Sequence, residues 1–480
     1  MIPPRWSVFL LAIAAVACSA PSGSDGPVRH VVFISLDTTR PDHFGFYGSP
    51  KVRTPNLDKL ASESIVLDDF MTVAPTTLAS HASLFTGKYP HSHGTPRNGF
   101  MVHEDNVLLA EILHEAGFST AGFVGAFPLA SQFGIAQGFD HWDEEFERFE
   151  GVDAVLVNER TAESVTDAVI RYLDEVDLGR KQFLFVHYFD PHAPYESPSP
   201  YDTLYDPQGR DGLRDWLSLV RDCHRLSATR TQPPEELVEE AWRMAAQYAA
   251  EVTYTDVQVG RLLANLRERG MLDDALLVVT SDHGESFWEH GECFDHGWNT
   301  YDSTMRIVGL IRLPGAAGAG TRVPGLLTNL DVLPTVLDYL GIAVPEAIDG
   351  KAMDLESASP KAPGGPRFGQ ATKPWQSVET DPRWHNLHKS RCIRQGKLKL
   401  IQVPTAGMER LYDLSRDPIE SVNLLGTPNA EVDSVVGPMR RKLETWAASA
   451  DPLPTYFVPG EQNEVIERLR ALGYLGGDEQ

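Results

Sequence analysis

Apolar residues gather along the chain in short uninterrupted runs that are bounded by polar residues. Runs of this length without alternation are typical of strands buried on both faces of a sheet. The clearest predicted strands cover residues 31–36, 120–124, 183–188, 276–280 and 307–313.

Between these runs the apolar residues recur at helical spacing. Helices are predicted over 107–116, 162–176 and 234–269, and the longest ends before Gly270. Strands that alternate with helices predict an α/β fold with a mainly parallel sheet flanked by helices. Residues 197–233 break the pattern and are interpreted as a surface excursion, and 356–366 as a proline-rich linker. We therefore predict a catalytic domain over 28–355 and a small C-terminal α+β subdomain over 367–480.

The N-terminal segment has the pattern of an export signal. One positive charge, Arg5, precedes an apolar run over 6–17, which is shorter than the roughly 20 residues that span a bilayer. Small residues stand before Cys18, as in a bacterial lipoprotein box, so residues 1–18 are interpreted as a signal peptide, Cys18 as the lipidated residue and 19–27 as a tether. A plain secretory signal is the alternative. Either way the chain is expected to be exported to the bacterial periplasm or cell envelope, and lipidation of Cys18 would anchor it to the outer membrane.

Composition narrows the class of protein. The 480 residues are 42% hydrophobic and 23% charged, as in a globular enzyme, and the net charge is −25. Such an acidic surface repels phosphate backbones, so no nucleic-acid partner is expected, although a metal ion could invert the field within one pocket. Four cysteines are too few for a disulfide scaffold. If Cys18 carries lipid, three cysteines remain for disulfide bonds. At least one of these three is therefore unpaired within the monomer.

Two predicted strands end in residues that bind metals. Asp37 follows the first strand, and Asp282 and His283 follow the strand at 276–280. Reacting groups in open α/β sheets lie past the carboxyl ends of strands. Two carboxylates and an imidazole suit Zn²⁺, Mn²⁺ or a similar divalent ion. The alternative for each aspartate alone is a helix or loop cap.

Several motifs, in one order, resemble the sulfatase family of the alkaline phosphatase superfamily. They stand at 31–48 (VVFISLDTTRPDHFGFYG), 54–58, 74–94 (APTTLASHASLFTGKYPHSHG), 191–195 (PHAPY), 281–291 (SDHGESFWEHG), 329–335, 411–418 and 472–475. The resemblance implies an alkaline-phosphatase-like fold and a metal-dependent hydrolase of sulfuric or phosphoric esters. It also implies one divalent ion (Zn, Mn, Ca or Mg, with Zn or Mn favoured) on Asp37, Asp282, His283 and the nucleophile.

The nucleophile position departs from the family motif. Family members that mature to formylglycine carry Cys or Ser in C/S-x-P-x-R, and the register places Thr77, Ala79 and His81 on its three fixed positions. Threonine cannot be oxidised to formylglycine, so that cofactor is not expected. Thr77 would instead attack directly, with Thr76 as the alternative nucleophile. The family's Lys-x-His pair is also missing from 124–129 (VGAFPL), and both losses count against sulfate esters.

The resemblance assigns further residues to the substrate. His192 corresponds to a histidine that contacts the ester oxygens and serves as catalytic acid, and His296 lies near the position of a lysine that binds them. Asn98 matches a substrate-binding asparagine of phosphonate monoester hydrolases, with an Asn-Gly turn as the alternative. His81 either contacts substrate or packs against the sheet. Asp190, His192 and His296 could instead hold a second metal ion, as in two-metal phosphatases.

Together these observations predict an exported hydrolase of a small-molecule or glycan ester that uses Thr77 and slightly favours phosphoesters. A transferase that passes a phospho-group to an envelope glycan or lipid is the alternative. The membrane is expected as a partner only through the N-terminal lipid.

Overall fold

The computed structural model describes residues 28–146, 158–229, 231–357, 359–373, 389–426, 430–449, 453–454 and 462–471. The predicted signal peptide (1–18) with Cys18, and the tether (19–27), lie outside the described residues. Within the described part of the chain, every helix is too short or too polar to cross a bilayer.

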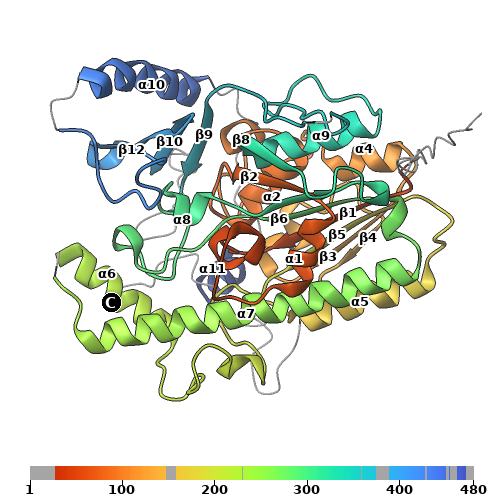
Figure 1. The fold of residues 1–480 in the computed structure, drawn as a ribbon, viewed down its shortest axis with the longest axis horizontal. Helices are drawn as coiled ribbons and strands as arrows, with labels where there is room; N and C mark the ends of the chain where they lie inside the picture. The colour runs from red at the N-terminus through yellow and green to blue at the C-terminus, as the bar shows by residue number, and fades with distance from the viewer. Residues whose placement is uncertain are drawn as a thin grey trace, which may run out of the picture.

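An eight-stranded sheet forms the centre of the molecule (Figure 1), in the order β4-β3-β5-β1-β6-β7-β2-β8. Its strands are β1 (His30–Leu36), β2 (Ile65–Met71), β3 (Ser119–Val124), β4 (His141–Asp143), β5 (Gln182–Tyr188), β6 (Ala275–Ser281), β7 (Gly309–Arg312) and β8 (Arg322–Thr328). All neighbours pair in parallel except at β7, which is antiparallel to both β6 and β2. The predicted mainly parallel sheet is therefore confirmed.

Helices cover both faces of this sheet. The first face carries α1 (Pro55–Ser62), α5 (Ala162–Glu175), α6 (Trp216–Thr229) and α7 (Glu235–Glu268). The second face carries α2 (Thr77–Thr86), α4 (Leu109–Glu115), α9 (Val332–Tyr339) and α11 (Gln462–Ala471). Two one-turn helices, α3 (Pro90–His93) and α8 (Asp302–Met305), lie in the connections. The fold thus has three layers.

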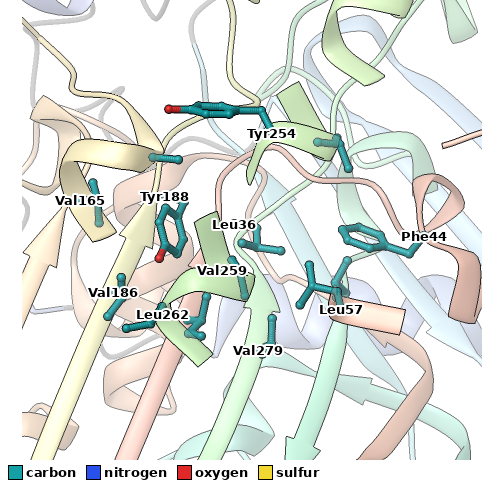
Figure 2. Packing of buried hydrophobic residues seen from close by; sticks show 14 of the residues in the cluster. Leu36, Phe44, Leu57, Val165, Val186, Tyr188, Tyr254, Val259, Leu262 and Val279 are labelled. Atoms are coloured by element: carbon teal, nitrogen blue, oxygen red, sulfur yellow. The ribbon is translucent and has the colours of Figure 1, made fainter. Parts of the chain in front are cut away.

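Apolar side chains from α5 and α7 pack directly onto the middle strands (Figure 2). Val165 of α5 and Leu262 of α7 belong to one buried cluster with Val186 of β5 and Val279 of β6. Because the side chains of these strands are buried on both sheet faces, each strand reads as a continuous apolar run in the sequence.

The structure contains three strands that were not predicted, β2, β4 and β8, and it differs from the prediction over 197–233 as well. Strand β2 was not predicted, because Asp68 and Asp69 interrupt its apolar run; both are only half-buried. The predicted surface excursion over 197–233 contains a regular helix, α6, whose Leu219 and Cys223 are buried against the core. Most of the arginines and aspartates that suggested an irregular segment precede this helix, and Arg221 and Arg225 within it are exposed.

A second, antiparallel sheet follows the predicted linker and confirms a C-terminal α+β unit. Its strands are β9 (Arg367–Ala371), β10 (Ser390–Gln395), β11 (Leu398–Val403) and β12 (Met408–Asp413), in the order β12-β11-β10-β9. Helix α10 (Ala430–Ala448) packs on this sheet through Met439, Leu443 and Trp446. The last helix, α11, instead packs Val465 and Leu469 into the core of the large sheet.

A buried cluster of charges joins the two sheets. The Lys399 ammonium lies 2.6 Å from Asp302 and 2.9 Å from Glu420, and its side chain is fully buried. Arg394 forms two hydrogen bonds of 2.9 and 3.0 Å with the carboxylate of Asp69 on β2. Each charge therefore depends on a partner that comes from another part of the chain.

Replacing Lys399 by methionine is expected to lower the free energy of unfolding by about 3–5 kcal/mol, because Asp302 and Glu420 would be left buried beside each other. The control is Lys397→Met, since the Lys397 side chain is 62% exposed and its 3.5 Å pair with Asp69 contributes little. Urea unfolding of both variants measures the difference. Equal stability of the two variants would contradict this account of the junction.

Candidate active site

The register of β1 and β6 brings the predicted metal-binding residues together. The two strands pair in parallel with Leu36 opposite Ser281, so Asp37 and Asp282 leave the sheet side by side. Asp37 is fully buried, and Asp282 and His283 are nearly so. The two strand ends therefore converge in the structure, which the apolar pattern alone could not show and the family resemblance implied.

Three atoms that could coordinate a metal, one from each of these residues, face one another. Nε2 of His283 lies 3.3 Å from Oδ2 of Asp282 and 3.8 Å from Oδ1 of Asp37. The Thr77 hydroxyl lies 3.5 Å from the same imidazole nitrogen and also hydrogen-bonds to the Asp37 carboxylate. Two carboxylate oxygens, one imidazole and one hydroxyl thus surround a common point.

In each of the three possible metal ligands, the side-chain atom that does not face this common point is already hydrogen-bonded. Oδ1 of Asp282 accepts from the backbone N–H groups of Thr38 and His283, at 3.1 and 2.8 Å. Nδ1 of His283 donates to the Gly284 carbonyl at 3.0 Å, and Oδ2 of Asp37 lies 3.1 Å from Nε2 of His187. These contacts fix the orientation of the three side chains, as outer-shell partners do in metal sites.

The backbone on both strand ends is shaped to make these contacts. Thr38 has a φ of 50°, which a β-branched residue rarely adopts, and this conformation directs its N–H at Asp282. Gly284 lies so close to α8 that a Cβ would stand 2.2 Å from the Ser303 carbonyl oxygen. Any larger residue would move the His283 turn.

The site fits a divalent cation. Among the described residues, Oδ1 of Asp37 and Oδ2 of Asp282 are buried and have no hydrogen-bond partner, and these are the two oxygens that face His283. Burial, with the neighbouring charges of Asp282 and Glu285, raises the pKa of Asp37 well above its usual range. Asp37, Asp282 and His283 form a compact group of possible ligands, and a cation between them would remove the repulsion.

Thr77 is the first residue of α2, so the N-terminus of that helix faces the same point. The helix dipole and the N–H groups of the first turn favour an anion there. The neighbouring Thr76 precedes the helix with extended backbone, and its methyl group stands near Gly297. Of the two threonines, Thr77 is the one that contacts His283 and Asp37.

Asn98 and His81 support the start of α2 in different ways. Oδ1 of Asn98 accepts from the N–H of Leu78 at 2.8 Å, and its buried Nδ2 has no partner among the described atoms. The His81 ring is fully buried, with Nδ1 2.7 Å from the Thr77 carbonyl and Nε2 2.8 Å from the Ser35 hydroxyl. These contacts favour the alternative in which His81 packs against the sheet.

His192 and His296 lie next to each other beside the donor set. Their ring centroids are 5.2 Å apart, and the His296 ring is 4.3 Å from that of His283. Nδ1 of His192 donates to the Ala193 carbonyl at 2.7 Å, whereas Nδ1 of His296 lies 3.2 Å from Glu285. Burial lowers the pKa of His192 well below its usual value, so the imidazole is neutral at pH 7.

The structure does not bring Asp190, His192 and His296 together as a second metal site. Oδ2 of Asp190 accepts from the N–H of Ala162 at 2.7 Å, at the first turn of α5. The groups of possible ligands in the described part of the chain are two, and neither includes these residues. The other group is His81, His187 and Asp282, whose imidazole nitrogens hydrogen-bond to Ser35, Thr77 and Asp37.

Sequence reasoning missed His187, the fully buried residue that holds Asp37. It lies within the apolar run of β5, where a polar side chain interrupts an otherwise hydrophobic strand. The N–H of Gly125 donates toward its Nδ1 at 3.4 Å, which leaves Nε2 as the donor to Asp37. A lone histidine in a doubly buried strand is the signal that could have identified it.

Replacing His187 by alanine is expected to weaken binding of a divalent ion about 10- to 100-fold, because Asp37 would lose the partner that orients it. Titration calorimetry with the ion-free protein and Zn²⁺ or Mn²⁺ measures the change. His114→Ala, on a side chain that is 55% exposed, is the control. Unchanged affinity in the His187 variant would show that Asp37 needs no support.

The loop that carries His296 is also held by the C-terminal sheet. The ammonium of Lys373, just after β9, lies 2.6 Å from Oδ1 of Asp295 and 3.3 Å from the His296 carbonyl. Oδ1 of Asp295 accepts the His296 N–H at 2.7 Å as well. The C-terminal sheet therefore helps to position a histidine of the candidate site.

Comparison with known proteins decides the family. The family model described as "Sulfatase" matches residues 29–342, which is more than half of the chain. The chain belongs to the sulfatase family. A second model, described as the C-terminal region of N-sulphoglucosamine sulphohydrolase, matches residues 288–449 of this sulfatase-family protein.

Individual relatives are distant but extensive. N-acetylglucosamine-6-O-sulfatase of Bacteroides thetaiotaomicron is 26% identical, over 88% of this chain and 87% of the relative. The multifunctional alkaline phosphatase superfamily protein PehA of Trinickia caryophylli is 24% identical, over 89% and 97%. The phosphonate monoester hydrolase structure of Agrobacterium radiobacter superposes with a TM-score of 0.67 at 23% identity, over 88% and 95%.

These findings confirm the predicted family, the fold and the enzyme class. The sulfatase-family protein is a hydrolase of the class that acts on sulfuric ester bonds. The family uses a divalent metal, for which Asp37, Asp282 and His283 form a possible site.

Proposed function

We propose that the protein is an exported, metal-dependent ester hydrolase that uses Thr77 as its nucleophile and prefers phosphoesters to sulfate esters. The observation that supports this most directly is the position of Thr77. Its hydroxyl lies at the N-terminus of α2, 3.5 Å from His283, and hydrogen-bonds to Asp37.

Asp37, Asp282, His283 and Thr77 are the residues that would hold the divalent ion. Such an ion supplies Lewis acidity, which lowers the pKa of the hydroxyl and neutralises charge on the ester oxygens. Of the metals considered, Zn²⁺ and Mn²⁺ suit the one nitrogen and the carboxylate oxygens of this set.

The reaction proceeds in two displacements at phosphorus. In the first, the Thr77 oxygen bonds to phosphorus, the Thr77 proton is lost, and the bond to the leaving oxygen breaks. In the second, a water oxygen displaces the Thr77 oxygen, which recovers a proton, and phosphate or its monoester is released. The helix N-terminus stabilises the negative charge in both steps.

The leaving oxygen needs a proton, and the rings of His192 and His296 lie beside His283. Nδ1 of His192 carries the ring proton of the neutral imidazole, because it donates to a backbone carbonyl. Glu285 holds His296 and is itself held by the Tyr195 hydroxyl at 3.0 Å. A neutral imidazole at this place can first accept the proton that Thr77 loses and then, once protonated, donate it to the departing oxygen.

The preference for phosphorus follows from the single hydroxyl of Thr77. A formylglycine diol carries a second hydroxyl, so its sulfate ester can collapse by elimination, whereas a threonine ester must be hydrolysed at the central atom. The segment in place of the family's Lys-x-His pair is also apolar, because Phe127 and Leu129 are buried there. No cation from that segment binds a sulfate group.

The proposed substrates are esters of small molecules or glycans. Two relatives support this range, since one is named as a sulfatase of N-acetylglucosamine and a solved neighbour as a phosphonate monoester hydrolase. The chain's net charge of −25 disfavours long polyanions such as nucleic acids.

An ester panel tests the proposal. The purified chain is supplied with Zn²⁺ or Mn²⁺ and with aryl sulfate, phosphate monoester, phosphate diester and phosphonate monoester substrates. A phosphoester should give the highest kcat/KM. Turnover of aryl sulfate well above every phosphoester would overturn the preference. Retention of the phospho-group on an added glycan or lipid acceptor, without released phosphate, would identify the transferase alternative instead.

Export is proposed from the N-terminal sequence. In a bacterial host, the mature chain is expected to begin at Cys18 and to carry lipid, because small residues precede that cysteine. Intact mass and N-terminal peptide analysis of the membrane fraction measure both features. In Cys18→Ser, the lipid should be lost. An unmodified N-terminus elsewhere in the wild type would reject the lipid anchor.

A further inference from the structure

Helix α6 lies against the loop that carries Asp295 and His296. The indole N–H of Trp216 donates to the Phe294 carbonyl at 2.9 Å, so the first turn of the helix is tied to this loop. One turn from the end of α6, the His224 ring is 6.0 Å from the Trp298 ring and its Nε2 is 4.0 Å from Asp295. In Figure 1, α6 lies at one end of the molecule beside α7.

Two cysteine thiols meet in this interface. Cys223 stands in the middle of α6 and Cys293 in the loop, and the two thiols lie close enough to interact. One turn further along α6, Ser227 lies against Gly291 of the same loop, where a Cβ would stand 2.4 Å from the Ser227 hydroxyl oxygen. Each residue is 1% exposed, and both belong to the same buried cluster as Trp216 and Phe294. A contact between two thiols across a buried interface is the arrangement from which a disulfide forms.

We propose that Cys223 and Cys293 form a disulfide bond that fastens α6 to the His296 loop. The third described cysteine, Cys392, lies on β10 in a different buried cluster and stays a thiol. The sequence alone left the pairing open, because spacing does not show which cysteines meet in the fold.

An external disulfide, such as oxidised glutathione, is the oxidant that forms the bond. A thiolate of the pair attacks oxidised glutathione, forms a mixed disulfide and releases one glutathione thiolate. The second thiolate then attacks the mixed disulfide, closes the protein bond and releases the second glutathione. Two protein thiols are oxidised, one glutathione disulfide is reduced, and two protons leave. In a bacterial envelope, a disulfide-donating oxidoreductase supplies the same equivalents.

Closing the bond would hold the loop from a second side. Cys293 is two residues from Asp295, which Lys373 already binds from the C-terminal sheet. The loop would then be fixed to α6 by a covalent bond and to the C-terminal sheet by an ion pair. The contact with Cys223, together with burial, raises the pKa of the Cys293 thiol, so oxidation is expected to be slow in the folded chain and faster during folding.

Peptide mapping tests the pair in the wild-type full chain. The protein is refolded with oxidised and reduced glutathione, unfolded in denaturant with N-ethylmaleimide and no reductant, and digested. The expected result is a linked peptide that joins Cys223 to Cys293, with Cys392 alkylated. Alkylation of both Cys223 and Cys293, or a link between any other two cysteines, would overturn the proposal.

Stability gives a second measurement with matched variants. Reductant is expected to lower the Tm of the oxidised wild type and of Cys392→Ser, but not that of Cys223→Ser. Because the peptide map uses the wild type, it remains decisive even if Cys223→Ser folds poorly. A Tm that reductant does not change in the wild type would contradict a bond that fastens the helix to the loop.

Discussion

Replacing Thr77 by alanine is expected to lower kcat for every hydrolysed ester by about a thousandfold or more, because the variant lacks the atom that forms the covalent intermediate. Binding of the divalent ion should weaken far less, since Asp37, Asp282 and His283 remain. Steady-state kinetics on the preferred ester and titration calorimetry with Zn²⁺ separate the two effects. The result would locate the defect in the chemistry rather than in the metal site.

Two controls sharpen this prediction. Thr77→Ser keeps a hydroxyl at the same position and should retain measurable turnover. Thr76→Ala removes the neighbouring buried hydroxyl, which has no partner among the described atoms, and should leave kcat nearly unchanged. Near-normal turnover by Thr77→Ala would remove Thr77 from the mechanism, and loss in Thr76→Ala alone would assign the role to Thr76. Mass spectrometry should show Thr77 unmodified in the wild type.

Asp282→Asn and His283→Ala are each expected to lower bound metal and activity together, with affinity for the ion reduced by more than about a hundredfold. The reason is that Oδ2 of Asp282 and Nε2 of His283, only 3.3 Å apart, face the same point. Metal content by mass spectrometry and kcat/KM are measured on the same samples. Asp273→Asn, on an exposed side chain, is the control.

Binding of the divalent ion at the same site should weaken as pH is lowered. Burial raises the pKa of Asp37 in the ion-free chain, so a proton competes with the metal for that carboxylate. Affinity for the ion is therefore expected to fall as pH is lowered. Full activity of the metal-stripped wild type, or an affinity that rises toward acidic pH, would contradict the metal site.

Local patterns predicted which residues at the strand ends could bind a metal, and the sheet order then showed that they converge. Asp37 and Asp282 each follow a continuous apolar run, and β1 and β6 are neighbours in the sheet. His187 was missed because it lies inside such a run, where periodicity registers only an interruption. Its role depends on the contact with Asp37, from a strand about 150 residues earlier in the chain.

Other contacts left no local pattern at all. Thr77, His192 and His296 were found through the family resemblance, and only the fold shows how close they lie. Asp190 has the residue type of a metal ligand, but its carboxylate is used at the start of α5, which no spacing in the sequence reveals. Contacts between distant segments of the chain could therefore not be predicted from the sequence.

The charged junction between the two sheets limits how this enzyme could be recombined with its relatives. A chimaera that exchanges only the part after the linker would keep Asp69 and Asp302 but receive foreign residues in place of Arg394 and Lys399. Unless the donor carries matching cations, two carboxylates would be buried without partners. Evolution by exchange of C-terminal segments would thus require correlated changes on both sides of the crossover, and successful hybrids are expected to inherit both halves of this cluster from one parent.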